Sequence, residues 1–501
     1  MKFRRRTTSL ASALVVALAL SLAACSPSGP SNKHFDDVTI ALADKLPSIE
    51  TGQLNSRDQG LVLGPVYATL TSLDKNGSAV PELAKSWTVS DDGLQARFVL
   101  RGGLVFSDDT PLTAADVVAS INLARKSDSF IYAQAFASVV STEAESATTV
   151  LFKLSSPLPD LPMLLADAAL GVFPASRVSE KGFFDKPISA GRYVLEKSAK
   201  DGSSFSMTAN PLYWGGATAP KRLKFVTIED ASSRLSQLRA GTIDMADALV
   251  PATLDQKFAD VKIKYVPAFG GIKIFGNTKK GLTADVRIRQ AISAAINRRA
   301  IATTAVPGAG LAAAGYFPPT SQYYLANLAD ANPKAAKDLL KGTSCASGCK
   351  IEVLVDGTDE TGRTIALMAK EQLAKIGIDL TISQVDFGVL VDRLLNNDHD
   401  LVIVSTFSFS DDATILPALE LSAGLGTGFV PDESTGGLIQ NVITSTGQKR
   451  ADAADALSKA FATQLPFIPV MSEGYITGSR TGLPLSISKA QLLHFNEEGA
   501  N

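Results

Sequence analysis

The sequence predicts a mixed α/β protein that has more than one lobe and contains a parallel β-sheet. The chain has 501 residues, and the 477 that follow an N-terminal leader exceed what one hydrophobic core usually supports. Residues 351–404 alternate between short β-branched runs and helical patterns. This alternation is typical of strand–helix–strand units with right-handed crossovers.

Within that unit the pattern predicts strands whose two faces are both buried. The runs are rich in Ile, Leu and Val, as strands covered by helices on both sides usually are. A glycine at 377 separates the longer helix from the second strand. The expected elements are strands at 351–355, 378–385 and 401–404, with helices at 361–376 and 387–395.

A hairpin and three helices are expected earlier in the chain. Asp91-Asp92-Gly93 is a turn signal between two apolar runs, and Thr113 with Asp116 forms a capping box. Apolar residues spaced at helical periodicity follow Asp230 and the region of Thr283. The hairpin strands are expected at 86–90 and 94–100, and the helices begin at 113, after 230 (ending at Gly241) and near 283.

The N-terminus predicts an exported protein. Lys2 and Arg4–Arg6 precede a mainly apolar stretch at 10–24, which is too short for a comfortable transmembrane helix. Leu22-Ala-Ala-Cys25 resembles a bacterial lipobox, in which the cysteine thiol receives a lipid and becomes the first residue. The polar stretch that follows would be a flexible tether. An uncleaved anchor or an ordinary secreted protein is the alternative.

Charge argues against nucleic acid as a partner. Removing residues 1–24 takes away four basic and no acidic residues, so the net charge changes from −2 to −6. A nucleic-acid-binding surface would call for a basic patch or stripe. No later stretch is long and apolar enough to span a bilayer, so we expect attachment to the outer face of the plasma membrane without a span.

Two cysteines remain in the exported chain, Cys345 and Cys349. In an oxidising compartment such a close pair most often forms a local disulfide. Binding of a metal would require further ligands nearby, and His34, His399 and His494 are scattered. We expect neither a metal nor a cofactor.

Four sequence blocks resemble the peptide/nickel-type solute-binding proteins of ABC importers, the extracellular family 5 class. The first, Val-Pro-Glu-Leu-Ala-Lys-Ser-Trp at 80–87 continued to 118, carries the most specific likeness. The others keep the family's order along the chain. They are Asn-Pro-Leu-Tyr-Trp-Gly-Gly at 210–216 continued to 244, Asn-Thr-Lys-Lys at 277–280 continued to 298, and 372–378 with 465–470.

This resemblance implies a periplasmic-binding-protein-like fold: two α/β lobes with a hinge, and an extra subdomain inserted in the first lobe. Ligand would sit between the lobes, which close around it. The expected boundaries are a lipoprotein signal peptide at 1–24, a tether at 25–32, the first lobe at 33–60, 186–268 and 468–501, the inserted subdomain at 61–185, and the second lobe at 269–467.

The resemblance also implies where a peptide amine would bind. Peptide-binding members meet it with an aspartate in the loop after the strand at 401–404. Here Ser408 stands at the expected place, and Asp411 and Asp412 follow. Either one of these aspartates takes the role or the ligand lacks a free amine; both carboxylates could instead cap the next helix.

Position alone suggests further ligand contacts, without a motif match. Asn55 and Ser56 fall in the first crossover loop, and residues 269–271 at the first crossing between lobes. Tyr475 falls near the return crossing. The candidates are Asn55, Ser56, Phe269, Gly270, Gly271 and Tyr475, with Phe407 and Phe409 as apolar walls.

The predicted function is capture of a small solute for an ABC permease and its ATPase subunits. A peptide is the first choice of ligand, followed by oligosaccharides or opine-like solutes, and the protein is expected to be a monomer. A sensing receptor of the same fold is the alternative. An exported hydrolase ranks lower, because no complete catalytic motif is present. The arginines of the third block (287, 289 and 298) are expected to be solvated or salt-bridged.

Overall fold

The structure is a computed structural model, and it describes residues 35–46, 49–50, 57–127, 133, 135–178, 180–325, 328–406 and 428–495. The predicted leader, Cys25 and the tether therefore lie outside the described residues. The unit considered below begins at Asp36.

The first lobe is built on a sheet that mixes parallel and antiparallel pairs. Strand β1 pairs in parallel with β10 and β11, and β8 to β10 form an antiparallel meander. Helix α5 packs against this sheet through Leu238. The elements are β1 (Asp37–Leu42), α2 (Arg57–Val66), β8 (Tyr193–Ser198), β9 (Ser204–Ala209), β10 (Arg222–Thr227), α5 (Ala231–Ala240), β11 (Met245–Ala246), η3 (Pro251–Thr253), β17 (Leu485–Ile487) and β18 (Leu493–Phe495).

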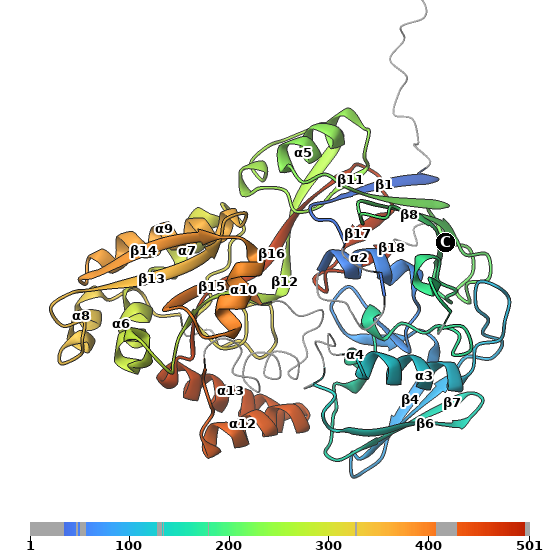
Figure 1. The fold of residues 1–501 in the computed structure, drawn as a ribbon, viewed down its shortest axis with the longest axis horizontal. Helices are drawn as coiled ribbons and strands as arrows, with labels where there is room; N and C mark the ends of the chain where they lie inside the picture. The colour runs from blue at the N-terminus through green and yellow to red at the C-terminus, as the bar shows by residue number, and fades with distance from the viewer. Residues whose placement is uncertain are drawn as a thin grey trace, which may run out of the picture. The chain divides into compact units, whose positions relative to one another are not determined.

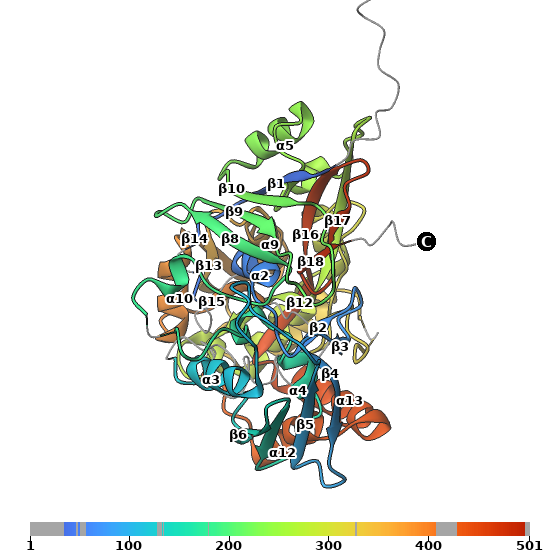
Figure 2. The same cartoon turned by 90° about the vertical axis from the view of Figure 1, so that its right-hand side faces the viewer.

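A separate antiparallel sheet is inserted between α2 and β8. Its four strands lie in the order β4-β5-β7-β6, and Figure 2 shows β4, β5 and β6 side by side at the lower end of the view. The elements are β2 (Thr71–Leu73), β3 (Ala79–Pro81), β4 (Ala84–Val89), β5 (Gln95–Leu100), α3 (Ala114–Arg125), β6 (Val139–Ser146), β7 (Thr149–Leu154), α4 (Leu161–Leu164), η1 (Ala168–Leu170) and η2 (Phe183–Asp185).

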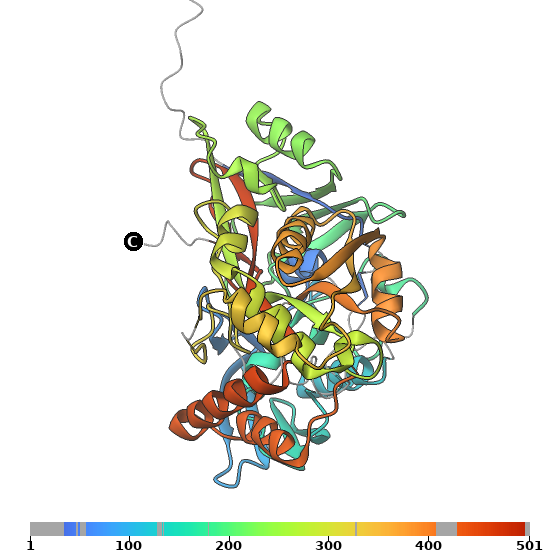
Figure 3. The same ribbon diagram turned by 90° about the vertical axis from the view of Figure 1, so that its left-hand side faces the viewer.

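The second lobe contains the parallel unit. Strand β13 pairs in parallel with β14 on one side and with β15 on the other. Figure 3 looks onto this lobe, with α12 and α13 in red at the bottom. The elements are η4 (Leu282–Ala284), α6 (Val286–Ala295), α7 (Arg298–Ala305), α8 (Pro333–Leu340), β13 (Cys349–Asp356), α9 (Glu360–Ala374), β14 (Ile378–Val385), α10 (Phe387–Leu395), β15 (Leu401–Thr406), α12 (Glu433–Thr444) and α13 (Gly447–Gln464).

Two long antiparallel strands pass from one lobe to the other. They are β12 (Val261–Gly276) and β16 (Phe467–Arg480), and Figure 1 shows them between β13 to β15 and β1 with β11. Through them, ten strands of the described chain form one sheet in the order β14-β13-β15-β12-β16-β11-β1-β10-β9-β8. The molecule thus has two α/β lobes with a shared sheet and an inserted subdomain.

Side-chain alternation along the strands of the second lobe divides its core into two layers. Val353 and Ile403 pack with helices α6 to α9 on one face, whereas Leu354 and Val402 pack with α10, α12 and α13 on the other. Successive residues of a strand point to opposite faces, so a strand covered on both sides must be apolar throughout. This explains why the runs at 351–355 and 401–404 are continuous.

Most elements expected from the sequence are present at the expected places. The hairpin is β4–β5, the capped helix is α3, and the strand–helix unit is β13-α9-β14-α10-β15. The third helix begins at Val286 after a short 3₁₀ turn, three residues later than Thr283 suggests. Cys345 and Cys349 are joined by a disulfide, with their Cα atoms 4.9 Å apart.

The expectation for the third-block arginines is correct only for Arg287, which pairs with Asp285 at 2.7 Å near the surface. Arg289 is 5% exposed and donates to the carbonyl oxygens of Leu465, Thr283, Ala284 and Gln464 at 2.6 to 3.0 Å. Burial lowers the pKa of Arg289 to about 10, so it remains a cation at neutral pH. Its guanidinium holds the C-terminal end of α13, which leads into β16, against α6.

We predict that Arg289→Met lowers the free energy of unfolding by about 3 kcal/mol or more, because several buried carbonyls lose their donors. Arg287→Met, on the same helix but at the surface, should leave it unchanged. Urea unfolding of both variants measures the difference. Equal effects would show that the carbonyl contacts of Arg289 do not stabilise the end of α13.

Candidate functional site

The two crossing strands lose their regular pairing at one place. Pro267 is opposite Gly474 and Gly271 is opposite Ser472, so three residues of β12 (268–270) face the single residue Glu473 of β16. Such bulges bend a strand and are frequent beside functional sites. The predicted contacts Gly270 and Gly271 therefore lie at the irregularity between the lobes.

Side chains from the second lobe hold the backbone at this irregularity. Thr320 donates to the carbonyl of Ala268 at 2.7 Å, and Thr406 donates to the carbonyl of Gly271 at 3.1 Å. Gly474 has no room for a side chain, because an added Cβ would lie 2.4 Å from the ring of Tyr265. The backbones can approach here only because Gly474 is a glycine.

Glu473 is buried at the centre of the crossing with an exposed fraction of 4%. Its Oε1 accepts from the Tyr475 hydroxyl at 2.6 Å, and Ser405 of β15 also bonds to the carboxylate. Burial raises the pKa of Glu473 despite these bonds. Its Oε2 has no hydrogen-bond partner among the described residues.

A buried arginine at the start of α2 anchors this cluster to the first lobe. Both terminal nitrogens of Arg57 donate hydrogen bonds to the carboxylate of Asp247, and its Nε donates to Gln491 Oε1 at 2.7 Å. Its guanidinium also stacks on the Tyr475 ring, 3.9 Å from the centroid. Burial alone would lower the pKa of the Arg57 guanidinium. Attraction to Asp247 outweighs this effect, and the pKa is raised.

Asp58 adds a second carboxylate with an unpaired oxygen. It lies 3.5 Å from Arg57, and its Oδ2 has no partner among the described residues. Burial, and then repulsion from Asp247, raises the pKa of Asp58 to about 6. Asp247 already satisfies Arg57, so Asp58 is left with little compensation for its burial.

The second lobe faces this cluster with acidic groups at the end of a strand. Asp356 ends β13, and Asp359 caps the N-terminus of α9. Burial is the main cause of the raised pKa values of Glu473 and of Asp44, which follows β1. Repulsion from Asp359 adds a smaller rise at Glu473, and repulsion from Asp356 adds one at Asp44. Carboxyl ends of strands are where α/β proteins usually bind ligands.

The structure brings together some of the sequence candidates. Gly270, Gly271 and Tyr475 meet at the crossing, and β15 ends beside them at Thr406. Asn55, Ser56, Phe407, Ser408, Phe409, Asp411 and Asp412 lie outside the described residues.

Sequence reasoning missed Arg57, Asp58, Asp247 and Glu473. A glutamate inside the apolar run Phe-Ile-Pro-Val-Met-Ser-Glu-Gly-Tyr was a usable signal, because buried charges in strands need a partner. Arg57-Asp58 at the start of an otherwise apolar helix was a weaker signal.

The cluster provides unpaired carboxylate oxygens in a buried setting, which suits a cationic or hydrogen-donating ligand group. Within the described residues, no three His, Cys, Asp or Glu side chains gather closely enough to hold a metal ion. The same residues include no helix with the length and apolar character that a bilayer crossing needs.

Comparison with protein families matches residues 78–424 to the bacterial extracellular solute-binding proteins, family 5 Middle. A probable di/tripeptide-binding protein 5 of Pseudomonas aeruginosa is 30% identical over 367 residues, which cover 66% of this chain and 68% of that protein. The oligopeptide-binding protein AppA of Bacillus subtilis is 27% identical over 467 residues, covering 84% and 85%.

Solved structures share the fold. The periplasmic binding protein DppA of Helicobacter pylori, in complex with the peptide STSA, has a TM-score of 0.80 at 20% identity and covers 92% of this chain and 96% of its own. NikA of Brucella suis, in complex with Fe(III)-EDTA, has a TM-score of 0.81 at 22% identity, covering 92% and 99%.

A buried ion pair joins the inserted subdomain to the second lobe. Arg450 of α13 donates to Asp160, which precedes α4, at 2.5 Å, and the two side chains are only 6% and 3% exposed. Burial disfavours the charge of Arg450, but Asp160 and Tyr323 together raise the pKa of its guanidinium. The pair spans segments 290 residues apart and exists only while they are in contact.

We predict that Arg450→Gln loosens this contact, because it leaves the buried Asp160 carboxylate without its cation. The radius of gyration of the ligand-free protein, measured by small-angle X-ray scattering, should increase. Lys459→Gln removes an exposed pair on the same helix and should change nothing. An unchanged radius for Arg450→Gln would mean that the pair does not hold the two parts together.

Proposed function

The chain belongs to the bacterial extracellular solute-binding proteins of family 5, and we propose that it captures a peptide between its lobes and delivers it to an ABC importer. The observation that carries the proposal is the cluster of buried, unpaired carboxylate oxygens at the irregular crossing of β12 and β16. A peptide amine is a cation that such oxygens would bind. Several relatives with peptides in their names support this class of ligand.

Closure of the two lobes would exclude water from this site. The hinge in this proposal lies at 267–271 and 472–474, where strand pairing is irregular and the backbone is held by side chains. The lobe boundaries expected from the sequence, near 268 and 468, are part of the same proposal. Hinges are commonly a few residues at the ends or breaks of regular elements.

Attachment to the membrane is the second part of the proposal. Cys25, after Leu-Ala-Ala and a short apolar stretch, would carry the lipid at the outer face of the plasma membrane. The binding protein would then remain close to the permease and ATPase subunits of its importer. Metabolic labelling with a radioactive fatty acid, lost in Cys25→Ser, tests the anchor.

We expect the purified protein to retain its ligand. Mass spectrometry of the small molecules released on denaturation should identify short peptides, and adding those peptides back should raise the melting temperature. Recovery of a sugar alone, with no melting shift by any peptide, would contradict the peptide assignment while leaving solute binding intact.

Glu473→Gln should weaken binding of the recovered peptide roughly 10- to 100-fold if Glu473 receives its amine, because one charge-assisted hydrogen bond is lost. Glu371→Gln, at an exposed position on α9, is the control. Asp411→Asn and Asp412→Asn test the rival contacts. If only these two weaken binding, the amine does not lie at Glu473.

Peptide affinity should also depend on pH. The folded pKa of Asp58 is raised to about 6, so this carboxyl is protonated below that pH and loses its attraction for an ammonium group. If the ammonium group of the peptide contacts Asp58, the affinity measured by calorimetry should therefore fall roughly tenfold from pH 7.5 to pH 5. A constant affinity over this range would exclude Asp58 from the site.

A further inference from the structure

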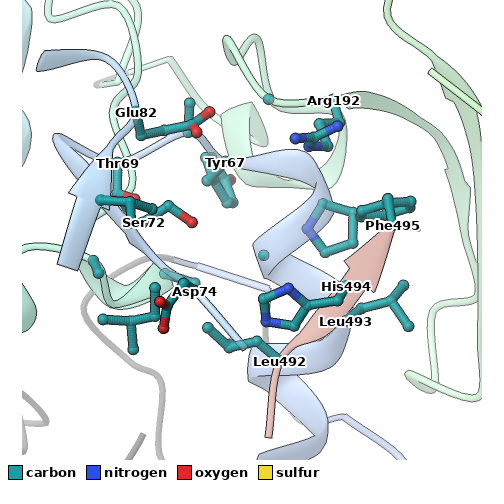
Figure 4. A pocket seen from close by; sticks show the side chains of 18 of the residues that line it. Tyr67, Thr69, Ser72, Asp74, Glu82, Arg192, Leu492, Leu493, His494 and Phe495 are labelled. Atoms are coloured by element: carbon teal, nitrogen blue, oxygen red, sulfur yellow. The ribbon is translucent and has the colours of Figure 1, made fainter. Parts of the chain in front are cut away.

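A cavity of about 540 Å³ lies in the first lobe and the inserted subdomain (Figure 4). Its walls come from the end of α2, the β2–β3 hairpin, the segments at 166–214, and residues 492–495. No residue of β12, β15 or β16 lines it. It is therefore separate from the crossing of the lobes, and its volume falls within the range of small-molecule sites.

Opposite charges face this cavity without pairing. The Arg192 guanidinium stacks on Tyr213 and Phe495, 4.9 and 5.4 Å from their ring centroids. Its N–H groups have no hydrogen-bond acceptor among the described residues, and no carboxylate there lies within 4.0 Å. Arginine stacking on aromatic rings fixes the cation without using its donors.

Glu82 lies across the cavity from Arg192, as Figure 4 shows. Its Oε1 accepts from the Tyr213 hydroxyl at 3.0 Å and from Trp214 Nε1 at 3.1 Å, which leaves Oε2 without a partner among the described residues. Burial raises the pKa of Glu82, and the two hydrogen bonds oppose that rise. The carboxylate is thus positioned by two aromatic donors, and its Oε2 can accept a hydrogen bond from a ligand.

Three more polar groups converge on the same space. Tyr67 is 2% exposed, and its hydroxyl has no partner within the described chain. Asp74, on the side of Glu82, uses Oδ1 for the backbone amides of Asn76 and Ser78. His494, on the side of Arg192, has an unpartnered Nε2, and burial lowers the pKa of its imidazole.

From this arrangement we propose that the cavity binds a small zwitterion of the amino acid class. The ligand carboxylate lies on the guanidinium of Arg192, and its ammonium lies between Glu82 and Asp74. Trp214 and Phe495 supply the apolar wall for its side chain.

The charge pattern selects a zwitterion over other solutes. An anion alone would be opposed by Glu82 and Asp74, and a cation alone by Arg192 and Lys75, which also lines the cavity. A neutral solute would leave Arg192 on one side and Glu82 on the other without a charged partner and partly desolvated, which costs free energy. A molecule with both charges satisfies both walls, and a guanidinium with free N–H groups binds a carboxylate through two parallel bonds.

The test uses L-phenylalanine as the probe, with N-acetyl-L-phenylalanine and L-phenylalaninamide as blocked analogues. Saturation-transfer NMR with the whole exported chain should detect saturable binding of phenylalanine. Both analogues should bind at least tenfold more weakly, because each lacks one charge. Absence of saturable binding, or equal binding of an analogue, overturns the two-point contact.

Variants place the binding in the cavity. Arg192→Gln and Glu82→Gln should each weaken phenylalanine binding at least tenfold, and Arg192→Lys less, because it keeps a cation in the stack. Arg239→Gln is the matched control, since Arg239 stacks on Phe258 outside the cavity. Unchanged binding in Arg192→Gln and Glu82→Gln overturns the site.

Glu473→Gln separates this site from the one between the lobes. It should leave phenylalanine binding unchanged, whatever it does to a peptide. If Glu473→Gln abolishes phenylalanine binding and the cavity variants do not, the amino acid binds between the lobes and the proposal is wrong. Failure of the peptide assignment does not affect this result, because the cavity shares no residue with the crossing.

Discussion

The pairing of β12 with β16 is the constraint on which the rest of the structure depends. The two strands join the lobes through one continuous sheet, yet three residues of β12 face a single residue of β16. Buried backbone groups at such a place must find other partners. Threonine side chains supply some of them, so this region is polar and buried, and it places Glu473 between the lobes.

Buried arginines hold this crossing from both lobes. In the first lobe, Arg57 is fixed by Asp247 and stacks on Tyr475 of β16. In the second lobe, Arg289 donates to the carbonyl of Leu465, the C-cap of α13 just before this strand, and Arg298 donates to that of Pro469 near the strand's start. In the proposed closure, rotation of one lobe against the other would be confined to the few residues between these two anchors. Glu473 lies within that interval, so the proposed ligand contact and the proposed hinge would involve the same segment of β16.

The local pattern predicted the parallel unit of the second lobe well, because the signals of that unit are short-range. Continuous apolar runs and a glycine stop at 377 defined β13, α9 and β14 almost to the residue. Arg289 could not be placed in the same way, because its carbonyl partners Gln464 and Leu465 lie some 175 residues further along the chain. For the site, position predicted Gly270, Gly271 and Tyr475 at the crossing. Glu473 between them was not predicted, because the family resemblance implies an acidic contact in the loop that contains Asp411.

The two sites share a structural connection although they share no residue. Arg57 begins α2 at the crossing, and Gly64 near the end of the same helix lines the cavity that contains Arg192 and Glu82. Arg57 also bonds Gln491, and the residues that follow, 492–495, form another wall of that cavity. A ten-residue helix extends about 15 Å and moves as a rigid element. The position of α2 therefore bears both on a wall of the cavity and on the Arg57 guanidinium that stacks on Tyr475.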